Sequence, residues 1–377
     1  PEEERIVATL SYPTEPIPVT AIAEISGVNE PITLRTLKLL TNRSIVVPQE
    51  GEEKYALVPM VAEFIRHARR ELVKEMGDRL AERAFRLIEA NGYYSHKQFP
   101  VLDAMWPSIA PSLALFLIGP NERLQTLCKA LNFFFDFSGR WDAWYSINCH
   151  AEGTAVSSGD YSNAGWRAYS LGLVHFRRRA GEAVLVCADR AAQHWLKAGT
   201  NGRERPAGLR LHGLGHHLSK NYSEAIKYYR DAEALWRILP GETINVAVTL
   251  NNLADTERCM GNLALAQQSY REALRRACEN KFPEGVATYT GNLAEVALEL
   301  TDWLAAEKLS RESLALSEIL GRQELIGTNC YRLGLSLMRQ GQITEAKNYA
   351  QRAVDIYTYL SSPHLVEAQA VLARCIG

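Results

Sequence analysis

A recurrence of small residues about every forty positions is the feature that most constrains how this chain can fold. The stretch 251–274, NNLADTERCMGNLALAQQSYREAL, returns forty residues later as GNLAEVALELTDWLAAEKLSRESL. The residue that anchors each copy falls, in chain order, at Asn132, Gly172, Gly213, Ala254, Ala294, Gly334 and Ala373, with spacings of 40, 41, 41, 40, 40 and 39 residues. A period of this length is typical of repeat architectures, in which stacked copies share a continuous core.

Each copy has the pattern of two amphipathic helices joined by a tight turn. Apolar and small residues recur at three- and four-residue steps on both sides of the turn, which Gly261 and Gly341 occupy in two copies. Glycine suits the turn because it adopts left-handed backbone angles without steric cost. The turn in the stretch RRRAGEAV is expected to carry one extra residue. Because one hairpin cannot bury its own apolar faces, the pattern predicts a mainly α solenoid, closed by the single helix VEAQAVLARCIG.

The first 76 residues lack the repeat and predict a small winged-helix domain. Three short helices are indicated by ERIVATLSY, PVTAIAEISG and EPITLRTLKLLTNRS, with Gly27 ending the second and Pro31 in the first turn of the third. The β-rich segments SIVVP and KYALVP flank the polar turn QEGEE and predict a hairpin. Residues 77–125 are helical but outside the repeat, and prolines break their second half, so we interpret them as a joining segment.

A winged helix suggests DNA as a partner, and its third helix offers Arg35, Lys38 and Arg43. However, residues 1–76 hold nine Lys or Arg against twelve Asp or Glu, a net charge of −3, and the turn that would touch phosphate reads EGEE. A duplex-binding surface has to gather positive charge to displace counterions. The sequence therefore argues against nucleic acid as a partner, and three basic residues on a solvated helix face are the simpler interpretation.

The overall composition excludes several classes of protein. Lys plus Arg (42) balances Asp plus Glu (43), so no net field draws the chain toward nucleic acid or an anionic membrane. The longest apolar runs, such as residues 113–118, are far shorter than the roughly 20 residues of a spanning helix. Seven scattered cysteines without a CxxC pair argue for reduced, packed thiols. With no export signal at the start, these features predict a cytoplasmic protein without a membrane partner.

The repeat resembles the tetratricopeptide repeat, whose L-G/A, G-x-Y-x-x-A and Y-x-x-A-L skeleton is matched almost slot for slot by units such as the one containing Ala254, Gly261 and Ala266. This resemblance implies about six units of roughly forty residues plus a capping helix over residues 126–377. The order of parts, a winged helix, a helical segment and then the repeats, resembles the C-terminal portion of NB-ARC-type STAND proteins. These are signalling ATPases whose switch domain is followed by a repeat sensor.

The second resemblance implies that this chain is the sensing and autoinhibitory region of such a protein. Because the chain opens at Pro1 rather than at a methionine, it is expected to be a piece of a longer protein, with the nucleotide-binding domain upstream and ATP or ADP bound only there. The chain has no Gly-Lys dipeptide and therefore no phosphate loop. Val58, Pro59 and Met60 stand where the family often has Met-His-Asp, so nucleotide sensing through that histidine is not expected.

The tetratricopeptide resemblance also implies a concave groove lined by the first helix of each unit, at positions three before and one, four and five after the anchor. Aromatic rings and arginines there suit a protein or peptide segment, because rings supply buried area while Arg and Asn orient polar groups. In similar repeats, asparagines on that helix clamp the backbone of an extended peptide. The predicted ligand-binding residues are Lys129, Phe133, Tyr169, Phe176, Arg177, Arg210, His217, Asn251, Asn252, Asp255, Arg258, Asn292, Glu295, Tyr331 and Arg339; the register also selects Asp136, Phe137 and Met338. The alternative is that some of these residues pack between units or only solvate the groove.

Three further clusters have structural interpretations. His212 and His216 lie four apart on one helical face, a geometry that zinc can use, but no third ligand is evident. In LNFFFDF, Phe134 and Phe135 are expected to pack on the joining segment rather than to form an exposed patch. The arginines at 177–179 are expected to complement a helix dipole rather than to grip an anion.

The functional prediction is a sensor that binds a protein or peptide in the concave groove, and ligand binding is expected to shift the winged helix relative to an upstream nucleotide-binding domain. No Ser-His-Asp order, GxSxG, HExxH or paired carboxylate emerges, so no enzymatic activity, metal or cofactor is expected in this chain. A transcription regulator with a DNA-binding winged helix and a peptide-sensing repeat domain is the alternative. A passive scaffold is a third possibility.

Overall fold

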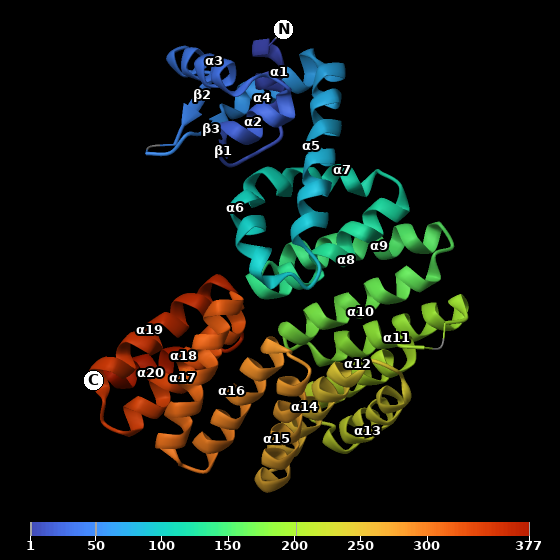
Figure 1. Cartoon of the computed structure of the whole chain (residues 1–377), viewed down its shortest axis with the longest axis vertical. Coiled ribbons are helices and arrows are strands. Elements are labelled where there is room, and N and C mark those ends of the chain that lie inside the picture. The colour runs from blue at the N-terminus through green and yellow to red at the C-terminus, as the bar shows by residue number, and fades with distance from the viewer. Residues whose placement is uncertain (1, 50, 201, 377) are drawn as a thin grey trace. The chain divides into compact units, whose positions relative to one another are not determined.

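The computed structural model describes residues 2–49, 51–200 and 202–376. They form two compact units, Pro1–Phe134 and Phe135–Gly377, and Figure 1 shows that helices dominate both. The mainly α class and the repeat solenoid predicted from the sequence are confirmed.

The first unit opens with short helices and a small antiparallel sheet. Its elements are α1 (Glu2–Leu10), β1 (Ile17–Pro18), α2 (Val19–Ser26), α3 (Glu30–Asn42), β2 (Val46–Pro48) and β3 (Lys54–Leu57). The strand order is β1-β3-β2, with Ile17 opposite Tyr55 and Val46 opposite Leu57. The three helices and the hairpin lie where the sequence predicts them. Strand β1 was not predicted, because two residues are too few to show an alternating pattern.

Local signals explain the helix boundaries in this unit. Gly27 caps α2 with a φ of 70°, and Pro31 lies in the first turn of α3, as predicted. The apolar faces of these helices then meet around Ile22, Leu37 and Leu40, all of which are buried. This packing holds the hairpin at one side of the helices, because Val46 belongs to the same core.

Further helices complete the first unit. They are α4 (Pro59–Ala68), α5 (Arg70–Asn91), η1 (His96–Gln98), α6 (Phe99–Ile109), η2 (Ala110–Ser112), α7 (Leu113–Leu117) and the start of α8 (Asn121–Ser138). Helix α5 runs unbroken through the predicted boundary at 76/77 and packs on α1 and α2 as well as on α6 and α7. The predicted winged-helix and joining segments therefore share one compact unit, which ends inside α8 rather than at residue 125.

One stretch of this unit, His96–Leu117, has the length and hydropathy of a membrane-spanning segment, with a mean hydropathy of 1.3 and 28% of its window buried. In the structure it is divided among η1, α6, η2 and α7, with Pro107 inside α6. A single such stretch is weak evidence for a membrane, because core segments of other proteins have the same composition.

The second unit is a stack of antiparallel helix pairs (Figure 1). After α8 and α9 (Trp141–Ser157), the pairs are α10 (Tyr161–Arg177) and α11 (Gly181–Ala198), α12 (Glu204–Leu218) and α13 (Tyr222–Ile238), α14 (Thr243–Cys259) and α15 (Leu263–Glu279), α16 (Pro283–Glu299) and α17 (Trp303–Leu320), and α18 (Gln323–Arg339) and α19 (Ile343–Tyr359), followed by α20 (Leu365–Ile376). Each helix packs chiefly on its neighbours in sequence, as in a solenoid.

The backbone repeats more strictly than the sequence does. The turn inside each pair has a left-handed residue at Gly139, Arg179, Lys220, Gly261, Thr301 and Gly341, and the turn between pairs has one at Gly159, Gly199, Gly241, Lys281, Gly321 and Ser361. Arg179 keeps the same spacing as the others, so the extra residue predicted in RRRAGEAV is wrong. The geometry of the turn requires a positive φ at this position, and in about half of the turns a residue other than glycine adopts it.

Close helix contact explains the small anchor residues. A Cβ atom added to Gly213 would lie 2.4 Å from Cε1 of Tyr229 on the partner helix. Ala254 and Ala266, which face each other across the next pair, are both fully buried. Larger side chains at these positions would push the two helices of a pair apart.

Candidate functional site

The candidate site is the inner wall of the second unit, formed by the first helices of successive pairs, α10, α12, α14, α16 and α18. Contacts between neighbours connect this wall, such as the bond from Arg210 of α12 to Tyr169 of α10. Arg177 at the end of α10 also lies 3.6 Å from Glu324 at the start of α18 (Nη1 to Oε2), although 147 positions separate them. The row of first helices therefore curves back on itself, so that the end of α10 meets the start of α18.

A ladder of amides and charges runs across the last three of these helices. Asn292 donates from Nδ2 to Oδ1 of Asn251 over 2.8 Å, and Arg332 donates to Oδ1 of Asn292 over 3.2 Å and to Glu295 over 2.6 Å. Burial disfavours the ionised form of Glu295, but Arg332 and Arg258 hold its pKa below the ordinary value. The ladder brings together three predicted residues. Its fourth member, Arg332, was missed because it lies two positions before its anchor Gly334, outside the positions that the register counts.

Helix α14 contributes a second charged group. Arg258 pairs with Glu299 and lies 3.7 Å from Asp255 (Nε to Oδ1), which accepts a 2.5 Å hydrogen bond from the hydroxyl of Tyr270. Burial opposes the charge of Arg258, yet Asp255 and the other acids raise the pKa of its guanidinium. The charge of Arg258 also helps to lower the pKa of Glu295. Arg258 and the ladder therefore belong to the same wall.

A buried ion cluster joins the two ends of the row. Arg177 holds Asp136 with two bonds of 2.7 and 2.9 Å, while Arg322 pairs with Glu284 and lies 3.8 Å from Asp136 and 3.6 Å from Glu324. Burial would raise the pKa of Asp136, but the two arginines lower it below its usual value. The C-terminal ends of α8 and α10 are thereby connected to the N-terminal ends of α16 and α18.

Two further predicted residues on the first helices, His217 and Tyr331, carry rings that can ionise. His217 meets the Thr256 hydroxyl through Nδ1 at 2.9 Å, and burial lowers the pKa of its imidazole. Tyr331 is half-buried, and burial followed by Glu295 and Glu367 raises the pKa of its phenol. Both side chains therefore stay neutral near pH 7 and offer hydrogen bonds rather than charge.

Other predicted residues take no part in these contacts. Arg339 is exposed and lies over the ring of Trp303, 5.6 Å from its centroid. Phe176 is partly buried and packs on the core of the middle repeats. Lys129 and Phe133 lie in the first unit, where Lys129 is exposed and Phe133 packs edge-on against Tyr94 with ring centroids 4.9 Å apart.

The histidine pair is used for packing. His212 contacts Asp189 through Nε2 at 3.0 Å, and both His212 and His216 stack on the ring of Tyr228 with centroids 5.1 and 5.2 Å apart. Within the described ranges no group of three or more His, Cys, Asp or Glu side chains has the geometry of a metal site.

Phe134 and Phe135 are buried, and Phe134 packs on Phe99 and Trp106 of the predicted joining segment, as expected. The arginine run lies at the C-terminal end of α10, where basic residues complement the helix dipole, as expected. Two of its members also form ion pairs, Arg177 with Asp136 and Arg178 with Asp142.

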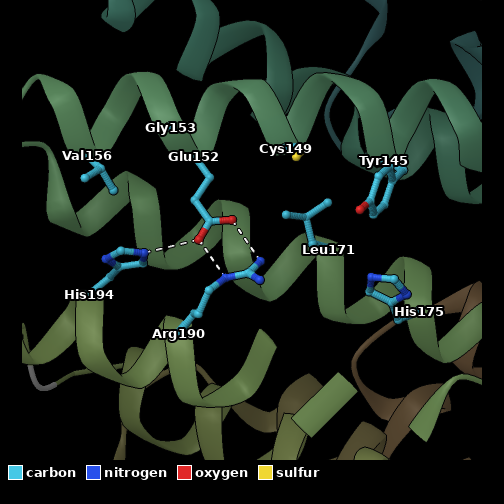
Figure 2. A pocket seen from close by; sticks show the side chains of 9 residues that line it. All are labelled: Tyr145, Cys149, Glu152, Gly153, Val156, Leu171, His175, Arg190 and His194. Carbon is cyan, nitrogen blue, oxygen red and sulfur yellow. Dashed lines mark hydrogen bonds and ion pairs between the residues drawn. The ribbon is translucent and has the colours of Figure 1, made fainter. Parts of the chain in front are cut away.

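A pocket of about 480 Å³ lies between α9, α10 and α11, outside the inner wall. Figure 2 shows Glu152 at its centre, held by Arg190 through two 3.0 Å bonds and by Nε2 of His194 at 3.2 Å. Burial followed by the nearby arginines lowers the pKa of His175 at one end of the pocket. None of the predicted binding residues lines it. The spacing of Arg190 and His194, one turn apart on α11, is the signal that could have found it.

Comparison with known families identifies the repeats. The tetratricopeptide repeat family matches residues 204–279 and residues 328–358. No curated protein sequence matches the chain.

Solved structures share the fold at low sequence identity. A Rap protein complexed with Competence and Sporulation Factor has a TM-score of 0.54 and 12% identity, over 84% of this chain and 91% of that one. NprR in complex with its cognate peptide NprX has a TM-score of 0.51 and 13% identity, over 82% and 94%. A STAND protein with a tetratricopeptide repeat sensor from Pyrococcus horikoshii has a TM-score of 0.47 and 16% identity; the match covers 100% of this chain and 59% of that protein.

The repeats and the fold together define a tetratricopeptide-type solenoid, a protein-interaction architecture. No catalytic family matches the chain.

Proposed function

We propose that this chain is the ligand-sensing and autoinhibitory region of a STAND-type signalling protein and that it binds a protein or peptide along the inner wall. The observation that carries the proposal is that contacts and charges link Asn251, Arg258 and Tyr331, from different first helices, to Asn292 and Glu295 of α16. The Rap and NprR structures, which share the fold, contain Competence and Sporulation Factor and the peptide NprX, and this supports a peptide as the ligand.

The inner-wall amides have the chemistry that an extended backbone needs. Asn251 accepts from Asn292 but uses its own Nδ2 in no hydrogen bond among the described residues, and the Nδ2 of Asn252 is buried without a partner. A peptide backbone supplies carbonyl oxygens that can accept from both groups. A bound segment would thus satisfy donors that the protein leaves unused.

The autoinhibitory part of the proposal rests on the order of parts. Three helices and a hairpin, interpreted as a winged helix, precede the repeats, as in the C-terminal portion of STAND proteins. The ion cluster around Asp136 and Arg322 connects the two ends of the row of first helices. A ligand that binds more tightly when these two ends are differently spaced would therefore shift the arrangement of the first helices. The upstream nucleotide-binding domain, with its ATP or ADP, would be the partner that responds, in the cytoplasm.

Random heptapeptides displayed on phage and selected on the immobilised protein test the binding claim. Selected peptides, synthesised with a fluorescent label, should bind the wild type at least about 10-fold more tightly than the Asn251→Ala, Asn292→Ala double variant. Asn348→Ala, on the exposed side of α19, is the matched control and should bind as the wild type does. Peptides that bind the double variant equally well would refute the inner wall as the site.

A DNA-binding transcription regulator is the second candidate, because α3 exposes Arg35 and Lys38. The same face exposes Leu39, however, and Arg43 is paired with Glu3 at 3.0 Å. In a gel-shift assay with mixed-sequence duplex DNA at several salt concentrations, we expect the wild type and the Arg35→Glu, Lys38→Glu variant to behave alike. A shift lost in that variant would favour the regulator.

A further inference from the structure

The pocket between α9, α10 and α11 has two ends that differ in their hydrogen bonding (Figure 2). At one end, the two carboxylate oxygens of Glu152 accept from Arg190 at 3.0 Å each, and Nε2 of His194 lies 3.2 Å from Oε1. Among the described residues, Glu152 is the only acid that lines the pocket. Because its oxygens are already engaged, this end has little to offer a cationic ligand.

The other end holds donors that the protein does not use. Figure 2 shows Tyr145 and Cys149 extending from α9 and His175 from α10 toward this end. The rings of Tyr145 and His175 lie edge to face, with centroids 5.5 Å apart. In the part of the chain that the structure describes, neither the Tyr145 hydroxyl nor the His175 imidazole makes a hydrogen bond. A phenol and a neutral imidazole can each donate one hydrogen bond to a ligand.

Two arginines make the surroundings of this end positive. The guanidinium of Arg178 lies 5.4 Å from the centroid of the Tyr145 ring, and Arg190 lines the pocket. Burial, then Arg178 and then Arg190 lower the pKa of His175, and no carboxylate of the described residues counters them at this ring. Asp142, the partner of Arg178, is fully exposed, so water screens that pair. An anion between the two rings would thus meet two donors and two nearby cations.

The pocket also has the room and the apolar surface that a ring needs. Its volume of about 480 Å³ lies within the roughly 300–1,000 Å³ of small-molecule sites. Leu171, which is buried, and Val156, which is exposed, supply apolar contact. A Cβ atom added to Gly153 would have no atom within 4 Å, so α9 leaves the rim of the pocket open there. An aromatic ring suits this shape, because it can also pack edge to face on Tyr145.

We propose that this pocket is a second ligand site, which binds a small aromatic acid. The ring of the ligand packs on Leu171, and its anionic group accepts hydrogen bonds from Tyr145 and His175. The site lies outside the inner wall. The inference therefore does not rest on the proposed function, and either can fail without the other.

Alkylation of Cys149 reports whether the pocket is occupied, because this exposed thiol lines it. The probes are phenylacetate, phenylacetamide and phenethylamine, which share a ring and differ in charge. The protein is treated with N-ethylmaleimide, and mass spectrometry of its peptides gives the alkylation rates of Cys149 and of Cys278. Cys278 is exposed on α15, away from the pocket, and is the internal control.

Phenylacetate should slow the alkylation of Cys149 at least about 3-fold and leave the rate at Cys278 unchanged. It should do so at a concentration about 10-fold lower than phenylacetamide requires, because the charged acceptor makes the stronger hydrogen bonds. Phenethylamine should give no protection, because its ammonium group would meet Arg178 and Arg190.

Two variants test the position of the site and its preference for an acid. Gly153→Leu fills the rim without removing a hydrogen bond and should abolish protection. Arg178→Gln removes an exposed arginine whose partner Asp142 is in solvent. It should erase most of the preference for the acid and leave protection by phenylacetamide unchanged. The matched control is Arg237→Gln, an exposed arginine paired with Glu233 on α13, and it should keep the preference.

Several results would overturn the site. One is alkylation of Cys149 at an unchanged rate with phenylacetate at up to about 10 mM. Equal protection by all three probes, or protection that survives Gly153→Leu, would do the same. If Gly153→Leu does not fold, His175→Phe takes its place, because it keeps a ring and removes the donor. Loss of the acid preference in His175→Phe supports the site, and an unchanged preference overturns it.

Discussion

Ion pairs in the two units of the molecule use the same chemistry in different surroundings. In the first unit, Arg43 and Glu3 are paired with 60% and 50% of their side chains exposed. In the second, Arg322 and Glu284 are paired with only 7% and 14% exposed. The first pair is in solvent, whereas the second is surrounded by protein.

This difference decides what each pair does. An exposed pair contributes little, because water screens it and two long side chains must be ordered to form it. A buried pair contributes little net energy either, yet removing one partner leaves an uncompensated charge and is strongly destabilising. We therefore infer that the inner-wall charges specify how the ends of the row meet, while exposed pairs such as Arg43–Glu3 are dispensable.

The largest effect is expected for Asp136→Ala. Loss of this carboxylate leaves the largely buried Arg177 with only Glu324 at 3.6 Å, and we expect the free energy of unfolding to fall by about 3 kcal/mol. Urea unfolding followed by circular dichroism measures it. Asp142→Ala is the control, because the Asp142 side chain is fully exposed although paired with Arg178. Equal shifts for the two variants would show that burial does not separate them.

Gly213→Ala should have the next largest effect, which sharpens the comparison by testing packing inside a repeat without changing charge. The added Cβ would clash with the Tyr229 ring, so we expect a loss of about 1–3 kcal/mol in the same assay. Gly153→Ala, in α9 with no atom within 4 Å of its added Cβ, should instead stabilise the protein by up to about 1 kcal/mol. A stable Gly213→Ala protein would contradict the close approach of α12 and α13.

A smaller effect is expected from pH at His217. Burial, reinforced by Arg179 and Arg258 and opposed by Asp255, lowers the pKa of this histidine from its ordinary value of 6.5. Because the folded state disfavours the proton, the neutral form contributes stability above pH 6.5 that is lost as pH falls through the lowered pKa.

Between pH 7.5 and 5 the wild type should therefore lose about 1 kcal/mol more free energy of unfolding than His217→Gln does. Urea unfolding at both pH values gives the difference. Parallel pH profiles for the two proteins would show that His217 is not responsible.

The smallest effect is expected in the first unit. Glu4→Ala removes the partner of Arg69, and both side chains are about half exposed. We expect at most about 0.5 kcal/mol, a change that 0.5 M NaCl should abolish. A loss as large as that of Asp136→Ala would break the contrast between the two units.

Much of the fold could be predicted because local signals carry it. The turn at Gly261 and the caps at Gly27 and Pro31 act within a few residues of their own position, and the small residues at Gly213 and Ala254 act within one helix pair. The two-residue strand β1 and the unbroken passage of α5 through residue 76 escaped prediction, because both depend on packing from distant segments.

The candidate site was only partly predictable. Counting from the anchor located Asn251 and Glu295, since helical register places side chains on a face, and the tetratricopeptide resemblance added Asn292, which meets Asn251 directly and Glu295 through their shared partner Arg332. It also selected Arg339, which turns to Trp303, because register does not specify how far a long side chain reaches or what it stacks on.

The sequence by itself determined that this protein is a row of helix pairs that recurs about every forty residues, with a tight turn inside each pair, because each of those features is encoded within one repeat. Only the tertiary structure decided that Arg177 meets Glu324, that Arg332 reaches Asn292, and that Arg210 meets Tyr169. Those contacts depend on the curvature accumulated over several repeats. Small rotations between neighbouring pairs set that curvature, and no single repeat contains it.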